Sequence, residues 1–270
     1  MQLVLSVFPG IDLLGMGFER VGFTVVRGPD PLFGSSIIGW HPPANVFDGI
    51  IGGPPCQDFS AARRTPPTGA GLAMLHEFCR VVAEANPKWY LLENVSRVPT
   101  VCVPLYRIQR IDVDAREFGC PQSRLRHIQF GSRCGEVITV TRQEKLWGSP
   151  CCTASEGKRS TRRTWKEFCR LQGLPEDFAL PSFNLVGRYR AVGNGVPLPM
   201  AEALARAVTL RTTWHAAKLC QCGCGRPLVG EAVLATAACR KRQQRRRDAS
   251  SATQPKLTTL PLPFPSETTP

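Results

Sequence analysis

The chain has 270 residues, 43% of them hydrophobic, which is enough for one domain of ordinary catalytic size with a buried core. No stretch approaches about 18 uninterrupted apolar residues, so the composition excludes a membrane span. Twelve irregularly spaced cysteines in a chain of this length do not indicate a disulfide scaffold. The formal net charge of +13 favours a polyanionic partner, nucleic acid first, over a basic surface that serves solubility alone.

The hydrophobic pattern predicts alternating strands and helices. Short apolar runs predict strands at 3–8, 22–26, 47–51 and 89–92. Apolar residues at helical spacing predict a helix that ends near Phe18 and others at about 70–85, 165–171 and 197–208. Strands that alternate with helices are typical of the α/β class, so we expect a doubly wound, mostly parallel sheet.

The remaining segments differ in character. From Arg133 to about Thr161 the periodicity fades, and we interpret this stretch as an insert or small subdomain. A cysteine-rich segment follows at 220–239, and then a run, 240–247, in which six of eight residues are basic. Residues from about Asp248 onward are rich in Ser, Thr and Pro, which predicts a disordered tail.

The first motif is Gly-Gly-Pro-Pro-Cys-Gln at 52–57, directly after an apolar strand. Ligands bind parallel sheets at the carboxyl ends of their strands, and two prolines stiffen this loop. Cys56 is therefore a candidate nucleophile, although a single cysteine after a strand is more commonly structural. A thiol is mostly protonated at neutral pH, so such a nucleophile needs activation.

Three further motifs follow in chain order. Leu-Leu-Glu-Asn-Val at 91–95 places Glu93 at another strand end, where a solvated terminus or a helix cap is the simpler interpretation. Cys-Pro-Gln-Ser-Arg-Leu-Arg at 120–126 contains Arg124 and Arg126, which alternate and so point to one side of an extended segment. Val-Gly-Asn-Gly-Val-Pro at 192–197 predicts a turn immediately before a helix, whose N-terminus suits an anion.

Together, Pro-Cys-Gln, Glu-Asn-Val, Gln-x-Arg-x-Arg and Gly-Asn-x-Val, in this order, resemble the motifs of the DNA cytosine-5 methyltransferases of bacterial or bacteriophage type. The resemblance extends from about Leu3 to Val208. It implies a Rossmann-like fold that binds S-adenosylmethionine. RNA cytosine methyltransferases of the other common type carry their nucleophile in a later motif.

The resemblance also implies catalytic roles for Cys56, Glu93, Arg124 and Arg126. The Cys56 thiolate would attack C6 of a cytosine flipped out of the duplex, which makes C5 nucleophilic toward the methyl group. Glu93 would bind or protonate N3, and Asn94 would orient the neighbouring loop. Arg124 would hold the O2 side of the base, and Arg126 would support it or contact a phosphate.

For the cofactor, the resemblance points to residues at three strand ends and one turn: Phe8, Gly10, Asp30, Pro55, Asn194 and Val196. Asp30 would be the acidic anchor of the ribose. In the family's own first motif, which Phe8 and Gly10 match, Asp12-Leu13 replaces the usual pair of glycines. Ser35-Ser36-Ile37 stands where an aspartate would meet the adenine. Both departures predict an altered affinity for the cofactor.

The same comparison suggests a division of the chain. We expect a catalytic and cofactor-binding core at 1–132, a short target-recognition insert at 133–163, a return to the core at 164–215, a cysteine-rich basic extension at 216–248 and a disordered tail at 249–270. An insert of about 30 residues offers little surface for groove recognition, which predicts a short or relaxed target sequence. Basic residues such as Arg159, Arg162 and Arg163 would then supply much of the affinity.

The cysteine-rich segment offers Cys220, Cys222, Cys224 and Cys239 as ligands of a tetrahedral zinc site. Their spacing is tighter than in a usual Cys-x-x-Cys knuckle, so an extension without metal stays an alternative. The basic run would bind phosphates in either case.

We therefore expect a monomeric, cytoplasmic enzyme that acts on double-stranded DNA, in a bacterium or in the host of a bacteriophage, without a membrane partner. A cognate restriction endonuclease is a possible associate. Two alternatives remain open. One is a tRNA or RNA methyltransferase of the same fold, and the other is a DNA-binding protein whose activity is weakened by its altered cofactor loop.

Overall fold

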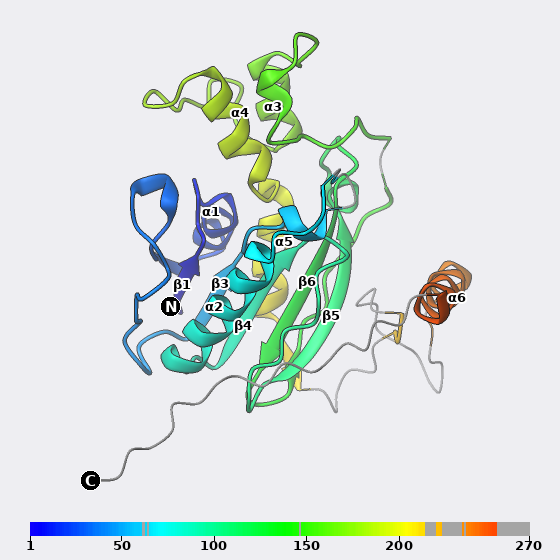
Figure 1. The fold of residues 1–270 in the computed structure, drawn as a ribbon. Helices are drawn as coiled ribbons and strands as arrows, with labels where there is room; N and C mark the ends of the chain where they lie inside the picture. Colours follow the sequence, from blue (N-terminus) through cyan, green and yellow to red (C-terminus); the bar gives the residue numbers. More distant parts are fainter. Residues whose placement is uncertain are drawn as a thin grey trace.

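The computed structural model describes residues 1–60, 63, 65–145, 147–213, 220–222, 234 and 236–252. A six-stranded sheet lies at its centre, in the order β2-β1-β3-β4-β6-β5 (Figure 1). The strands are β1 (Leu3–Val7), β2 (Thr24–Arg27), β3 (Gly49–Gly52), β4 (Trp89–Asn94), β5 (Arg107–Asp114) and β6 (Leu125–Ser132). β6 runs antiparallel to both of its neighbours, and the other pairs are parallel. This arrangement confirms the predicted doubly wound, mostly parallel sheet.

The register brings three strand ends to one edge of the sheet. Gly52, the last residue of β3, pairs with Val7 of β1 on one side and Leu92 of β4 on the other. The segments that follow β1, β3 and β4 therefore leave the sheet beside one another. The loop at 8–12 follows β1, Cys56 follows β3 and Glu93 stands near the end of β4, so the topology alone gathers residues that are far apart in the sequence.

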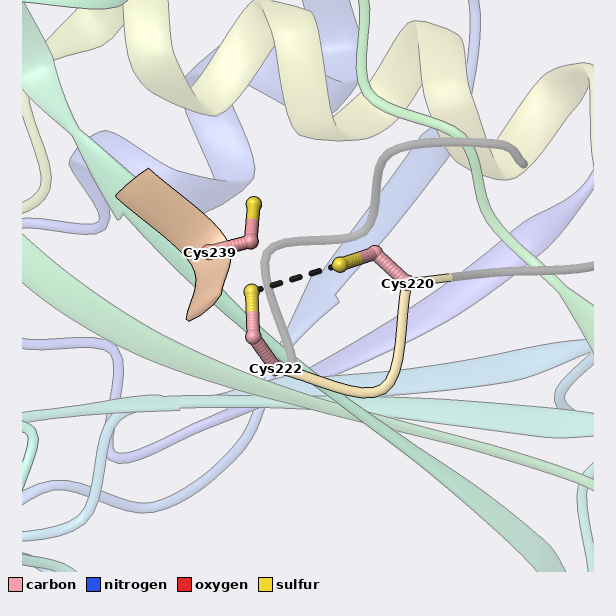
Figure 2. Close-up of side chains that lie close together, drawn as sticks. All are labelled: Cys220, Cys222 and Cys239. Atoms are coloured by element: carbon pink, nitrogen blue, oxygen red, sulfur yellow. Dashed lines mark hydrogen bonds between the residues drawn. The ribbon is translucent and has the colours of Figure 1, made fainter. Parts of the chain in front are cut away.

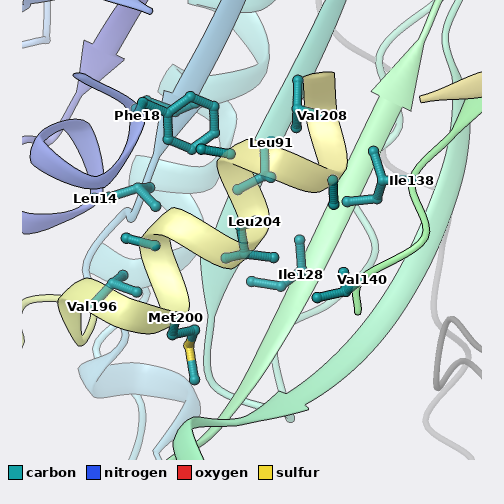
Figure 3. Packing of buried hydrophobic residues seen from close by; sticks show 14 of the residues in the cluster. Leu14, Phe18, Leu91, Ile128, Ile138, Val140, Val196, Met200, Leu204 and Val208 are labelled. Carbon is teal, nitrogen blue, oxygen red and sulfur yellow. The ribbon is translucent and has the colours of Figure 1, made fainter. Parts of the chain in front are cut away.

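Helices cover both faces of the sheet. α1 (Leu13–Arg20) and α5 (Leu198–Thr209) pack on one face, where Leu14, Leu91 and Leu204 belong to the same buried cluster (Figure 3). α2 (Ala70–Ala85) covers the other face through Leu75, Phe78 and Val82, as the helical spacing predicts. α1 and α5 approach closely because of Gly17, since a Cβ there would lie 2.4 Å from that of Ala201.

A small lobe stands beyond the end of the sheet (Figure 1). It contains α3 (Trp165–Leu171) and α4 (Leu185–Asn194), whose Phe168, Tyr189 and Val192 form a separate buried cluster. Leu13 and Leu198 join this cluster to α1 and α5. The expected return to the core at 164 is thus interrupted by a lobe with its own packing. In addition, 192–194 are the last turn of α4, where the sequence predicted only a turn.

The expected insert at 133–163 begins inside the core. β7 (Glu136–Val137) pairs with β8 (Thr212–Thr213), and Ile138 and Val140 are buried in the main cluster. Apolar side chains at 137–140 explain this, because they cover the sheet beside α5. The four 3-10 turns of the described ranges are η1 (Pro31–Phe33), η2 (Gln57–Phe59), η3 (Ala115–Phe118) and η4 (Glu156–Lys158).

At the C-terminal end, α6 (Ala237–Ala252) carries the basic run. The helix continues past the predicted start of the tail at 249, because no proline interrupts the chain before Pro255. The rest of the predicted tail, 253–270, lies outside the described residues. None of the helices in the described ranges is long and apolar enough to cross a bilayer.

Candidate active site

Cys56 lies in a loop that is attached to the end of β4. The Nδ2 group of Asn94 donates to the carbonyl of Pro54 at 3.0 Å, in agreement with the orienting role expected of it. Gly53 lets the loop pass close to Glu93, because a Cβ there would lie 3.2 Å from Oε2 of that carboxylate. The sulfur-bearing loop and the carboxylate are therefore neighbours.

The other side of the loop is attached to the start of α2 through Asp58. Its carboxylate accepts hydrogen bonds from the N–H groups of Gly71 at 2.9 Å and Thr68 at 3.1 Å, and it pairs with Arg63. These donors, led by the Gly71 amide, hold the pKa of Asp58 well below its usual range. Sequence analysis missed Asp58, although its place two residues after Cys56 makes it a natural anchor for this loop.

Glu93 and Arg126 form an ion pair across β4 and β6. Nε of Arg126 lies 2.8 Å from Oε1 of Glu93, with 14% and 9% of the two side chains exposed. The pair is thus shielded from water, where an ion pair is weakened least by solvent. Arg126 is placed to keep the Glu93 carboxylate in a fixed orientation.

The electrostatic surroundings of Cys56 reflect the same cluster. Burial raises the pKa of its thiol, and the negative charge of Glu93 raises it further. Arg126 and Arg124 act in the opposite direction and lower the pKa of the thiol. Four predicted catalytic residues from three motifs therefore share one electrostatic environment.

Arg124, however, is enclosed by the protein. Its guanidinium donates to the carbonyls of Cys152 at 2.8 Å, Gly193 at 3.0 Å and Gly195 at 2.9 Å, and only 2% of the residue is exposed. The terminal nitrogens of Arg124 donate to these carbonyls, whereas its buried Nε has no hydrogen-bond partner among the described residues. Arg124 therefore connects the segment at 151–152 to the turn after α4, and its expected role in holding a base stays a prediction.

A crevice runs along the carboxyl edge beside this cluster. It is lined by residues from the ends of β1, β3 and β4, from the start of α1 and from the turn after α4: Ser6, Val7, Phe8, Pro9, Asp12, Leu13, Leu14, Gly52, Gly53, Glu93, Asn194, Gly195 and Val196. Phe8, Asn194 and Val196 were predicted to contact the cofactor. Glu93 belongs to both the crevice and the Cys56 cluster, so the two sites share a wall.

The other three predicted cofactor residues lie around the crevice rather than in its lining. The N–H of Gly10 donates to Oδ2 of Asp30 at 2.9 Å, and Oδ1 of Asp30 accepts from Leu32 at 2.8 Å. Asp30 therefore supports the loop after β1 and caps the start of η1. Pro55 is exposed, next to Cys56.

Asp12 explains how the loop tolerates the loss of its usual glycine pair. It has a φ of 59°, a left-handed conformation that aspartate adopts more readily than most residues. Its Oδ1 accepts from Ser6 at 2.7 Å and from the Gly15 N–H at 3.0 Å, so the side chain caps α1. Its Oδ2 lies 3.0 Å from Nε of Arg27. Burial nevertheless raises the pKa of Asp12 to about 6, because removal from water outweighs these contacts.

The basic residues expected to bind DNA fall into two groups. Arg159 and Arg162 are exposed. Arg163 instead pairs with buried Glu156, with Nε 2.6 Å from Oε1, and also donates to the Pro150 carbonyl at 3.0 Å. Its charge is used inside the protein, so it is a structural residue rather than part of a DNA-binding face.

Two glutamines that sequence analysis did not assign connect the lobe to the motif loop. Nε2 of Gln122 donates to Oε1 of Gln172 at 2.8 Å and to the Leu171 carbonyl at 2.6 Å, and Oε1 of Gln122 accepts from Cys152 at 3.0 Å. Gln122 stands in the quoted Gln-x-Arg-x-Arg motif. A buried amide partner 50 residues away could not be identified from the pattern.

Of the four predicted zinc ligands, the structure brings Cys220, Cys222 and Cys239 together (Figure 2). Cys224 lies outside the described residues. This cluster is formed between the segment at 220–222 and the first turn of α6.

Comparison with known proteins agrees with this geometry. The model of the C-5 cytosine-specific DNA methylase family matches residues 41–100 and 139–209, which include Cys56, Glu93 and the Gly-Asn-x-Val turn. The chain belongs to this family. Among relatives, it is 28% identical over 175 residues to the Type II methyltransferase M.HgiDI of Herpetosiphon aurantiacus, covering 50% of this chain and 54% of that protein.

The Type II methyltransferase M.HindV of Haemophilus influenzae is 32% identical over 179 residues, covering 54% of this chain and 58% of the relative. The chain thus spans little more than half the length of these curated relatives. Among solved structures, the S. pombe Dnmt2 methyltransferase has a TM-score of 0.54 at 13% identity and covers 77% of this chain and 98% of its own. That likeness shows a Rossmann-like fold.

Proposed function

We propose that this chain transfers a methyl group from S-adenosylmethionine to C5 of cytosine in DNA. One observation carries the proposal: Cys56, Glu93 and Arg126 form a shielded cluster whose carboxylate also lines the crevice at the sheet edge. The reaction requires a nucleophile within reach of C6, a methyl donor within reach of C5 and a carboxyl group within reach of N3 of the same pyrimidine. Family membership and the Type II methyltransferase relatives support DNA as the substrate.

Cys56 supplies the nucleophile. Its thiolate forms a bond to C6 of the flipped cytosine, and the electron pair of the C5–C6 double bond moves into the ring, so that C5 can accept a methyl group. Loss of the C5 proton then lets the S–C6 bond break and restores the aromatic ring. Burial and the charge of Glu93 raise the pKa of the Cys56 thiol more than Arg126 and Arg124 lower it, so the thiolate is scarce in the absence of substrate.

Glu93 acts on the opposite side of the pyrimidine ring. Its carboxyl group, when it carries a proton, would donate that proton to N3, where negative charge develops when sulfur adds to C6. Arg126, 2.8 Å from Oε1, holds this group in place and is the arginine of the motif that remains near the base. Arg124 acts as a positioning residue, because its donors connect the walls on either side of the site.

The residues around the crevice would hold S-adenosylmethionine, which would supply an electrophilic methyl group when bound. Asp12 is 98% shielded in the lining, and its carboxylate, which is engaged by Ser6, Gly15 and Arg27, shapes the loop that would hold the methionine part. Phe8, Gly10 and Asp12 all have positive φ angles, so the loop turns sharply and leaves its backbone open toward the ligand. Asn194 and Val196 would close the crevice from the other side.

DNA binding relies on charge more than on a large recognition module. The part of 133–163 beyond the core residues is short, and Arg159 and Arg162 are exposed near α3. Such contacts bind phosphates without sequence selectivity. We therefore propose a short or relaxed target sequence, with a role beside a restriction endonuclease as in Type II systems. Bisulfite sequencing of DNA methylated by the purified chain tests this, and a long, strict target sequence would contradict it.

A covalent trap tests the central reaction. Incubation of the full chain with S-adenosylmethionine and a duplex that contains 5-fluorocytosine should accumulate a covalent protein–DNA complex, because fluorine at C5 cannot be removed as a proton. Cys56→Ser should form no complex. The matched control is Cys134→Ser, which changes an exposed cysteine in a turn before β7 and should form as much complex as the wild type.

The same assay separates the two alternatives. An RNA oligonucleotide with 5-fluorocytosine that traps the chain while DNA does not would assign the activity to RNA. Binding of DNA without any transfer of labelled methyl groups would indicate a binding protein.

A further inference from the structure

The three C-terminal cysteines form a compact sulfur cluster, which we call the Cys220–Cys222–Cys239 cluster. All three Sγ atoms lie within 4.8 Å of one another, and each residue is at most 4% exposed (Figure 2). Sγ of Cys220 and Cys222 are 3.4 Å apart. A disulfide requires about 2.05 Å, so these sulfurs are not joined to each other.

The spacing is that of ligands around one ion. A tetrahedral zinc ion with bonds of about 2.3 Å to sulfur places its ligand sulfurs about 3.8 Å apart. The observed separation of 3.4 Å and the limit of 4.8 Å bracket this value. Two of the sulfurs come from one tight turn and the third from a helix, as in zinc sites that join two segments.

Among the residues that the structure describes, little apolar surface packs against the cluster. Within the described ranges, its buried members are the three cysteines, and Leu234 is the partly buried side chain packed against them. Burial of a large aliphatic side chain contributes only about 1.5–3 kcal/mol, less than the entropy lost by ordering a few residues. A structural zinc ion contributes roughly 10–16 kcal/mol in small metal-binding units, so it can order a segment that hydrophobic burial cannot.

One ligand is also oriented by a neighbouring side chain. Oγ1 of Thr236 donates to Sγ of Cys239 at 3.1 Å and accepts from the N–H of the same residue at 3.2 Å. Thr236 thus caps the start of α6 and holds the sulfur at the same time. Hydrogen bonds of this kind fix the direction of metal ligands and tune their affinity.

We propose that Cys220, Cys222 and Cys239 bind a structural Zn²⁺ ion, and that the ion fixes the N-terminus of α6. The first turn of α6 contains Cys239 followed by exposed Arg240 and Lys241, with exposed Arg245 one turn further along. Metal binding therefore holds a cationic helix in one orientation, where it can contact a phosphate backbone. Cys224, the remaining ligand expected from the sequence, lies outside the described residues.

The test measures metal in the full chain. After purification without a metal-binding tag, mass spectrometry of the elements should find about one zinc per chain. Cys222→Ser and Cys239→Ser should each reduce this severalfold, and the matched controls Cys102→Ser and Cys134→Ser should retain it, because both cysteines are exposed and lie outside the cluster. Co²⁺ in place of zinc should give the intense visible bands of tetrahedral cobalt with thiolate charge transfer.

A measurement on the wild type does not depend on how the variants fold. Chelation should make at least three additional thiols reactive toward an alkylating reagent, and peptide mapping should place them at 220, 222 and 239. Absence of zinc together with absence of the cobalt bands would overturn the proposal. So would stoichiometric iron in place of zinc, or zinc that both cluster variants retain. Each readout is independent of methyl transfer, so failure here leaves the proposed activity untouched.

Discussion

The carboxyl edge of the sheet and the C-terminal cysteine cluster are organised in different ways. At the sheet edge, charged groups are fixed by the chain itself: Arg126 by Glu93, Arg124 by three carbonyls, and Asp12 by Ser6. At the C-terminal end, the described residues that contact the three buried sulfurs include Leu234 and Thr236. The comparison teaches that contacts within the chain fix the charged groups at the sheet edge, whereas the order of the cysteine cluster would depend on the metal ion that we propose.

Glu93→Gln gives the largest expected effect and tests the order at the sheet edge. Methyl transfer should fall by about 10³-fold, because the amide cannot stabilise charge at N3 as an acid does. Alkylation of Cys56 by iodoacetamide should become faster, because loss of the negative charge lowers the pKa of the thiol. Rate measurements of both reactions on one preparation check this. Slower alkylation together with slower transfer would mean that Glu93 only supports the loop.

Arg124→Met and Arg126→Met should separate support from catalysis. Removal of Arg124 leaves buried carbonyls without donors and should destabilise the fold by about 3 kcal/mol. Arg126→Met should lower methyl transfer by at least tenfold with a smaller loss of stability. Urea unfolding and initial rates measure the two effects. Equal losses of stability in both variants would contradict the assignment of Arg124 to support and of Arg126 to catalysis.

Asp12→Asn should reveal the cost of a buried charge. The pKa of Asp12 is raised to about 6 in the folded chain, against 3.8 in the unfolded chain. The folded state therefore holds the proton more tightly, so stability is higher below about pH 4 and is lost as pH rises through 6. Relative to the wild type, the variant should gain about 2 kcal/mol between pH 4.5 and 7. Unfolding curves of both proteins at the two pH values measure the difference in their free energies of unfolding. A difference that does not change with pH would contradict the prediction.

The smallest effects should come from the C-terminal end. Chelation of the full chain should lower its main unfolding temperature by no more than about 2 °C, because the main core does not include the cluster. Arg245→Gln should reduce the slope of log affinity for DNA against log salt by about 0.9 for one lost phosphate contact. Calorimetry and salt titrations measure these changes. A large fall in the main unfolding temperature on chelation would contradict the proposed independence of the two regions.

The sequence predicted those features that depend on residues close together in the chain. The helix at 70–85, the parallel strands, Cys56 and Glu93 followed from periodicity and from motifs at strand ends. The burial of Arg124 could not be predicted, because its partners lie 28 to 71 residues away and fold over it. The spacing of Arg124 and Arg126 indicated that both side chains point to one exposed side. That inference is valid only where no other segment covers the strand. The lobe of α3 and α4 was missed for the same reason, since its packing depends on contacts between distant segments.

Glu93 gives the enzyme a built-in form of thermodynamic linkage. Its carboxylate stands in the partition between the crevice and the Cys56 cluster, so a cation on one side and a pyrimidine on the other meet the same charge. The ligand that binds first changes the electric field at the site of the second, and each ligand must change the affinity for the other by the same factor. Binding at one site would thereby alter the affinity of the other through charge alone, without a movement of the backbone.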